Sequence, residues 1–301
     1  QKNHTTPPRC NITECGEAYL RNSLSQLLAL RIEEKCERLT MLYEKSGKRW
    51  NEALFRLLAR SFGFGIQSNV FEEWATLLNI QALGKHSDNI EQIEAIFFGQ
   101  AGLLCEESIP QYYRSEATAS NYYNTLLREY RFLKSKFSLQ EMEHGKWSGS
   151  ATPHIRIARL AALWQRGSVS IDRIARCDTV TELRSLFQVQ PSYYWQHHTQ
   201  FGGTTTVGPG DIKNRQLDVL IINTVVPMLY CYGKHRLDVN LCNKAEEYLR
   251  DINSEDNGII RRWAEQGVCA SNAAESQALI QLNNAYCTKQ RCGECPFVNK
   301  E

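Results

Sequence analysis

The stretch Trp50–Phe62, WNEALFRLLARSF, decides the fold class of this chain. Its large apolar side chains recur at positions i, i+4, i+7 and i+8, the spacing of one face of an α-helix. These positions are Trp50, Leu54, Leu57 and Leu58. Gly63 and Gly65 follow, and they end the pattern. The stretch therefore predicts a helix with one face buried in a core.

The same helical spacing dominates the rest of the sequence, and no segment shows convincing strand alternation. We predict an all-α fold, an irregular domain of about ten helices with a cysteine-rich C-terminal tail. Further helices are expected at residues 17–45, 71–78, 123–137, 180–187, 240–252, 256–266 and 271–286, and others beginning near residues 88, 153 and 211. The whole chain, 1–301, is expected to form a single helical body, with 138–152 as the candidate internal boundary.

Local signals give more detail on three of these segments. Thr152 is expected to cap the helix that starts at Pro153. Asp88 and Glu91 are expected to form a capping motif at the start of the helix near residue 88. Pro227 should kink the apolar helix that begins at residue 211 or end it early, because proline cannot donate the helical hydrogen bond. The Gly- and Thr-rich segment 201–210 is expected to be a loop.

The charge of the chain is balanced, with 35 Lys and Arg against 33 Asp and Glu. Overall charge therefore gives no argument for nucleic acid or an anionic membrane surface as partner. The longest apolar run, near 219–232, is shorter than the roughly 18 to 20 residues of a spanning helix, and we expect no membrane contact. Eleven cysteines, most of them scattered, indicate reduced thiols and a cytoplasmic location. Because residue 1 is Gln rather than Met, the native protein is expected to begin earlier.

Three cysteines gather near the end of the sequence with Cys-x4-Cys-x2-Cys spacing: Cys287, Cys292 and Cys295. Three thiolates in a short loop can converge on a metal, and thiolates suit Zn²⁺ or an iron–sulfur cluster. Zn²⁺ is the first choice, because no strand-rich ferredoxin context is present. The fourth ligand would be Cys10 or Cys15, which would join the two ends of the chain. The alternative is a set of reduced thiols without metal.

Two other groups of residues are candidates for binding. Arg156 and Arg159 are three residues apart on one helix face, where they could hold a phosphate or carboxylate. His197 and His198 follow a run of aromatic residues that could stack on bases, although aromatics beside a loop also serve as anchors. Adjacent imidazoles point in different directions, so we do not expect His197 and His198 to share a metal.

Polar residues inside apolar helical patterns raise a separate question. Asn223, Thr224 and Gln277 need hydrogen-bond partners if they are buried. They either line an interior polar pocket or form satisfied hydrogen bonds in the core.

Several stretches taken together resemble an uncharacterised family of Bacteroidetes proteins that contains a domain of unknown function. The stretches are residues 50–52 (WNE), 57–60 (LLAR), 62–64 (FGF), 93–95 (IEA), 98–104 (FGQAGLL), 155–158 (IRIA), 222–227 (INTVVP) and 276–279 (SQAL), with the terminal cysteine cluster. The resemblance implies that this chain is the C-terminal helical part of such a protein. It also implies a preceding nuclease-like region. An Arg-Pro stretch usual in the family is replaced here by residues 147–153, WSGSATP, which puts the role of those basic residues in doubt.

The resemblance and the residues together give a function hypothesis. We expect a non-catalytic helical domain that supports or presents substrate, with nucleic acid as the candidate, to the missing N-terminal region. One alternative is an enzyme with its own metal site or polar pocket. The other is a protein-interaction scaffold.

Overall fold

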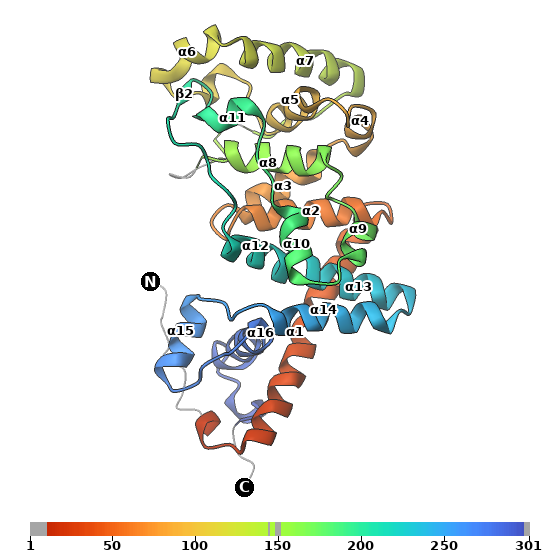
Figure 1. Ribbon diagram of the computed structural model, residues 1–301, viewed down its shortest axis with the longest axis vertical. Helices are drawn as coiled ribbons and strands as arrows, with labels where there is room; N and C mark the ends of the chain where they lie inside the picture. The colour runs from red at the N-terminus through yellow and green to blue at the C-terminus, as the bar shows by residue number, and fades with distance from the viewer. Residues whose placement is uncertain (1–10, 144, 148–151, 298–301) are drawn as a thin grey trace. The chain divides into compact units, whose positions relative to one another are not determined.

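The computed structural model describes residues 11–143, 145–147 and 152–297. These residues are predominantly helical (Figure 1). The one sheet in this part of the chain is a two-stranded antiparallel hairpin of β1 (His198–Gln200) and β2 (Gly203–Thr204). The all-α prediction is confirmed. The hairpin falls partly in the segment that was expected to be a loop.

The chain divides into two compact units. Unit 1 comprises Gln1–Glu44, Asp178–Val180 and Val225–Glu301, and unit 2 comprises Lys45–Cys177 and Thr181–Thr224. The segment 138–152, the candidate internal boundary, lies inside unit 2, so the units are not divided there.

Unit 2 is built around α5 (Ile90–Gln100), which packs against α7 (Asn121–Phe137) and α8 (His154–Gln165). Figure 1 shows α5 between these two helices. Eight consecutive residues of α5 are buried, so this part of the helix is covered on all sides, as expected of a central helix. The other helices of the unit are α2 (Trp50–Phe62), α3 (Ser68–Leu77), α4 (Ile80–Lys85), α6 (Arg114–Ala119), α9 (Ile171–Arg176), α10 (Val180–Phe187), α11 (Tyr193–His197) and α12 (Asn214–Leu220).

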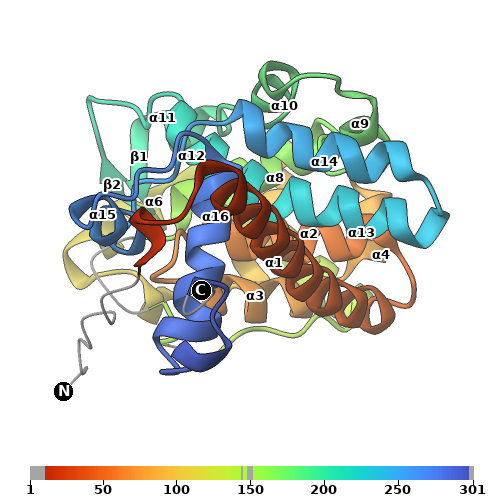
Figure 2. The same cartoon turned by 90° about the horizontal axis from the view of Figure 1, so that it is seen from below.

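Unit 1 contains the long helix α1 (Glu17–Lys45) and a pair of helices, α13 (Val226–Arg236) and α14 (Val239–Asp251), that lie side by side (Figure 2). Both α14 and α15 (Gly258–Glu265) contact α16 (Ala273–Leu282), which continues into a π-helical turn, Asn283–Cys287. Helix α1 presents its apolar stripe, including Leu28, Ile32 and Leu39, to the core of this unit.

Two of the expected helix starts differ from the structure by one residue. Asn89 rather than Asp88 caps α5, and its side chain accepts hydrogen bonds from the backbone of Glu91 and the residue after it. Pro153 occupies the N-cap position of α8, and Thr152 instead donates a 3.4 Å hydrogen bond to the carbonyl oxygen of Thr199. Both starts therefore lie within the one or two residues to which helix ends are defined.

Pro227 does not end its helix. The segment begins at Asn214 rather than at residue 211, passes through a π-helical turn, Ile221–Val225, and continues to Arg236. Pro227 directly follows the π-helical turn, and this turn accommodates a residue that cannot donate a helical hydrogen bond.

By length and composition, Asn214–Arg236 is long and apolar enough to cross a membrane, unlike the shorter run expected from the sequence. However, 72% of its most apolar window is buried inside the protein, as in the core helix of a soluble protein.

Candidate functional site

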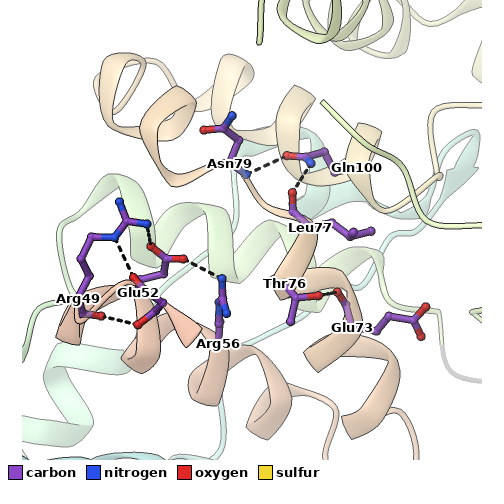
Figure 3. Close-up of polar contacts among 9 residues, drawn as sticks. Arg49, Glu52, Arg56, Glu73, Thr76, Leu77, Asn79 and Gln100 are labelled. Carbon is purple, nitrogen blue, oxygen red and sulfur yellow. Dashed lines mark hydrogen bonds and ion pairs between the residues drawn. The ribbon is translucent and has the colours of Figure 1, made fainter. Parts of the chain in front are cut away.

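Gln100, at the end of α5, ties together three segments of unit 2. Its side chain accepts a 3.3 Å hydrogen bond from the backbone N–H of Asn79 and donates to the carbonyl oxygen of Leu77 at 2.6 Å (Figure 3). It also donates to the carbonyl oxygen of Gln140 at 3.0 Å. The backbone oxygen of Gln100 also accepts a 2.9 Å hydrogen bond from Met142. A fully buried amide with this many partners fixes the backbone around it.

The glycines on either side of Gln100 allow close packing. A Cβ atom at Gly99 would overlap the ring of Tyr130 on α7. Gly102 has a φ of +69°, and a Cβ atom there would lie 2.9 Å from the carbonyl oxygen of Met142. The sequence at 98–104 thus shapes the surface that faces α7.

A pocket of about 470 Å³, which we call the α7 pocket, opens beside this surface. This volume is in the range of small-molecule sites. Helix α7 contributes Asn124, Tyr130, Arg131 and Lys134, and acidic residues line the opposite side. Lys134 forms a 2.6 Å ion pair with one of these, Glu141. The pocket therefore combines aromatic rings, hydrogen-bonding groups and both signs of charge.

The exposed face of α7 beside the pocket is basic and aromatic. The helix carries four basic residues and one acidic residue, Glu129. The side chain of Arg128 is 74% exposed, and the residue Phe132 is 61% exposed. The Nζ atom of Lys136 lies 5.6 Å from the centre of the Phe132 ring. An exposed ring among cations is an arrangement that suits stacked bases and phosphates.

A second polar group lies inside unit 2 and was missed from the sequence. Glu94 is fully buried, and burial raises the pKa of its carboxyl group to about 7. Tyr122 donates a hydrogen bond to it, and Trp195 Nε1 donates a 2.9 Å hydrogen bond to the Tyr122 hydroxyl. The Ser192 hydroxyl lies near the carboxyl group but in a geometry that makes no hydrogen bond.

His154 belongs to an aromatic cluster in the same unit. Its ring stacks on Phe98, with centroids 6.0 Å apart, and also contacts Trp195 and Phe201. Burial lowers the pKa of His154 to about 3, so the imidazole is neutral at ordinary pH. Its Nδ1 atom has no hydrogen-bond partner among the described residues. Helical spacing alone gave no signal for this cluster, because its members come from four separate segments.

The structure places Arg156 and Arg159 on one helix but gives them different protein partners. Arg156 donates to Gln67 and to the carbonyl oxygen of Phe62, at 3.3 Å, and its guanidinium group lies over the ring of Phe71. Arg159 donates to the carbonyl oxygen of Gly210 at 2.6 Å. These contacts favour structural roles. The binding of an anion by this pair stays a prediction.

His197 ends α11 and His198 begins β1, and both imidazoles contact the backbone of α11. The Nδ1 atom of His197 lies 3.1 Å from the carbonyl oxygen of Tyr193, and that of His198 lies 2.9 Å from the carbonyl oxygen of Tyr194. His198 also stacks on the Tyr194 ring, with centroids 3.8 Å apart. The two imidazoles thus have separate partners. Their role in recognition stays a prediction.

Cys287 and Cys295 are buried, and Cys292 is half-buried. Burial raises the pKa of Cys287 to about 11, and the nearby thiols of Cys295 and Cys292 add to this effect. The three thiols therefore lie in one region. No group of three His, Cys, Asp or Glu arranged to hold a metal ion occurs among residues 11–143, 145–147 and 152–297. Cys10, a proposed fourth ligand, lies outside the described residues. Metal binding stays a prediction, which metal analysis of the purified protein would test.

The polar residues in apolar helices have hydrogen-bond partners. Thr224 donates a 2.8 Å hydrogen bond to the hydroxyl of Ser61, and Asn223 donates to the carbonyl oxygen of Val219 at 3.0 Å. For these two residues, the structure supports core hydrogen bonds rather than a pocket.

Gln277 lies in a charged cluster of unit 1. Its Oε1 atom accepts hydrogen bonds from Lys35, at 2.7 Å, and Arg31, at 3.2 Å, and its Nε2 atom donates to Glu255. Burial and the charge of Arg31 lower the pKa of Lys35 to about 7. Two basic groups face an acidic one through a single amide, so the cluster is a largely compensated network.

Residues 50–52, one of the stretches that carry the family resemblance, include the buried residue Glu52. This buried carboxylate on α2 pairs with Arg56 at 2.8 Å and with Arg49 at 2.7 Å (Figure 3). The neighbouring Asn51 accepts a 2.9 Å hydrogen bond from the backbone of Ile171. The motif at 50–52 therefore stabilises the fold of unit 2.

These features define a helical protein with a polar pocket and a basic, aromatic face along α7. The family model described as a protein of unknown function (DUF2851) matches residues 1–258, and the chain belongs to this family. No curated protein and no solved structure was found to match the chain. The predicted membership of a family with a domain of unknown function is confirmed. The stretch 276–279 and the cysteine cluster lie beyond the matched residues.

Proposed function

We propose that this chain is a non-catalytic module that binds single-stranded nucleic acid along α7. The observation that carries the proposal is the exposed Phe132 ring between cationic side chains, with Lys136 over it. Base–aromatic stacking contributes roughly 1–3 kcal/mol per base, and cations beside the ring contact the phosphates. The chain would thereby support or present the strand to the nuclease-like region that the family resemblance implies.

The α7 pocket supports the same proposal. Arg131 belongs both to the basic helix and to the pocket wall, so a strand that follows α7 passes the mouth of the pocket. The pocket offers Asn124 and tyrosine rings to an unpaired base, whose edges are hydrogen-bonding and whose faces are apolar. A double helix keeps its bases stacked and paired, which favours a single strand as the ligand.

The test is fluorescence anisotropy with a labelled single-stranded oligonucleotide across a salt series. The logarithm of the association constant should fall with the logarithm of salt concentration, with a slope of about −0.7 per phosphate contact. Reversing the three charges in Arg128→Glu, Arg131→Glu and Lys136→Glu should abolish binding. Phe132→Ala should weaken it by roughly ten-fold, from the loss of about 1.4 kcal/mol of stacking.

A matched control changes the net charge by the same amount elsewhere. Arg21, Arg250 and Arg261 are mostly exposed residues of unit 1, and their replacement by Glu should leave most of the affinity intact. Equal losses in the two triple variants would show that binding depends only on net charge. That result would contradict the proposal. Absence of binding by the wild type at 50 mM salt would also contradict it, because the Debye length there is about 14 Å and charges are only weakly screened.

A further inference from the structure

Two buried cysteines of unit 1 lie together although they are far apart in the sequence. Cys36 is on α1 and Cys231 is on α13, and the thiol of Cys231 lies 3.7 Å from the backbone carbonyl oxygen of Cys36. The two thiols are also close enough to shift each other's pKa. Cys36 is 6% exposed and Cys231 is 4% exposed, and both are free thiols. This contact joins positions 195 residues apart.

The surroundings distinguish Cys231 from its partner. The hydroxyl of Thr40, one helical turn after Cys36, lies 3.6 Å from the sulfur of Cys231. The same hydroxyl donates a 3.0 Å hydrogen bond to the backbone carbonyl oxygen of Cys36. The neighbouring Cys36 thiol and Thr40 hydroxyl lower the pKa of Cys231 to about 7, whereas the Cys231 thiol and burial raise the pKa of Cys36. Cys231 is therefore the better nucleophile near neutral pH, and Cys36 keeps its proton.

Charged groups face the pair from both helices. Lys234, three residues after Cys231 on α13, forms an ion pair of 2.8 Å with Glu33 on α1. Lys234 lowers the pKa of Cys231, and Glu33 raises it. Both charged side chains are partly exposed.

We propose that Cys36 and Cys231 form a reversible oxidation site for a peroxide, with Cys231 as the attacking thiol and Cys36 as the resolving thiol. The proposal is independent of nucleic-acid binding. It rests on the contact of the Cys231 sulfur with the backbone of Cys36 and with the Thr40 hydroxyl, and on the position of the two cysteines on packed helices.

The chemistry is balanced with hydrogen peroxide as oxidant. The Cys231 thiolate attacks one peroxide oxygen, the O–O bond breaks, and Cys231 sulfenic acid and hydroxide form. The sulfur of Cys36 then attacks the sulfur of Cys231 and displaces hydroxide, which takes up the Cys36 proton. In total, two thiols give up two electrons and two protons, and one peroxide becomes two molecules of water. A thiol reductant reverses the reaction.

The experiment treats the reduced full chain with hydrogen peroxide, blocks remaining thiols, and maps disulfides by mass spectrometry of a non-reduced digest. The expected product is a peptide pair linked through Cys36 and Cys231 that disappears on reduction. In Cys36→Ser, Cys231 should accumulate as sulfenic acid and react with dimedone. Thr40→Val should slow the oxidation several-fold, because Cys231 loses a neighbouring hydroxyl that lowers its pKa.

The control is Cys269→Ser, which removes an exposed thiol and should leave the linked peptide unchanged. The disulfide mapping is done on the wild-type protein, so it remains decisive even if a serine variant fails to fold. The proposal is overturned if peroxide links or oxidises other cysteines while Cys36 and Cys231 stay reduced. It is also overturned if the linked peptide forms equally fast in Thr40→Val.

Discussion

The hydroxyl of Tyr122 donates a 2.7 Å hydrogen bond to the Oε2 atom of Glu94, a carboxyl group with no exposed surface. The other oxygen, Oε1, accepts no hydrogen bond from the described residues. One hydrogen bond does not replace the water that a carboxylate loses on burial, so the protonated form is favoured. The burial raises the pKa of Glu94 from 4.5 to about 7.

This raised pKa gives a prediction about stability and pH. Below pH 4.5 the carboxyl group is protonated in both folded and unfolded chains, and its contribution to stability is fully present. That contribution is lost as pH rises through about 7, and the loss is on the order of 3 kcal/mol. Glu94→Gln should remove this dependence. Urea unfolding of both proteins between pH 4.5 and 8 measures the difference, and parallel curves would contradict the prediction.

His154 gives the opposite dependence on the acid side. Burial lowers its pKa from 6.5 to about 3, so the folded protein holds the neutral imidazole while the unfolded chain takes up a proton. Stability should therefore fall as pH decreases from 6.5 towards 3, by on the order of 5 kcal/mol. His154→Phe keeps a ring in the aromatic cluster and should flatten this part of the curve. If the variant loses stability with acid as steeply as the wild type, other groups cause the loss.

Lys35 should titrate near neutral pH. Its pKa is lowered to about 7 by burial and by Arg31, so roughly half of the amine is neutral at pH 7. With ¹³C-labelled lysine, one side-chain resonance should shift with a midpoint near pH 7 and should be missing in Lys35→Met. The resonance of Lys234 is the internal control, because the Glu33 carboxylate raises its pKa. Midpoints above 10 for every lysine would contradict the prediction.

Gly99 should be one of the least replaceable residues of unit 2. In Gly99→Ala the new methyl group overlaps the buried ring of Tyr130, so we expect a loss of about 1–3 kcal/mol in the free energy of unfolding. Gly84→Ala is the matched control, because Gly84 lies in α4 with nothing near its added Cβ atom. There we expect a gain of up to about 1 kcal/mol. Thermal or urea unfolding measures both, and equal effects would argue against the close packing of α5 on α7.

Arg156 should not be replaceable by lysine. Its guanidinium group donates hydrogen bonds to Gln67 and to the carbonyl oxygen of Phe62 and also lies over the ring of Phe71, and an ammonium group cannot reproduce this fork. We expect Arg156→Lys to lower the free energy of unfolding by about 1–3 kcal/mol. The exposed Arg128→Lys should change it by less than about 0.5 kcal/mol. Unchanged stability in Arg156→Lys would return this arginine to the candidates for ligand binding.

The sequence allowed the fold class and most helices to be predicted because apolar spacing reports which face of a helix is buried. Helix α1 begins and ends at the expected residues, and α2 ends at the glycine that follows it. The π-helical turn before Pro227 was not predicted, because it depends on how the helix accommodates a proline within a longer helical segment. The hairpin at 198–204 was also missed, since strands this short carry no period.

The candidate sites could be predicted much less well. Spacing along one helix suggested that Arg156 and Arg159 act together, but their partners lie 50 and more residues away in the sequence. The contact between Cys36 and Cys231 likewise depends on packing between two helices. Gly99 and Tyr130, which pack closely, both line the α7 pocket, and the sequence around a helical glycine does not indicate which ring packs against it.

The hydrogen bonds of Gln100 couple three backbone segments that are separated along the chain. The link between α3 and α4 cannot move away from α5 without breaking the bonds of this amide, and the stretch around Gln140 depends on the same side chain. Local opening of these segments is therefore one cooperative event rather than three independent ones. Met142 lines the α7 pocket, and its backbone N–H donates to the buried Gln100. Gln100 therefore also restrains this wall of the pocket.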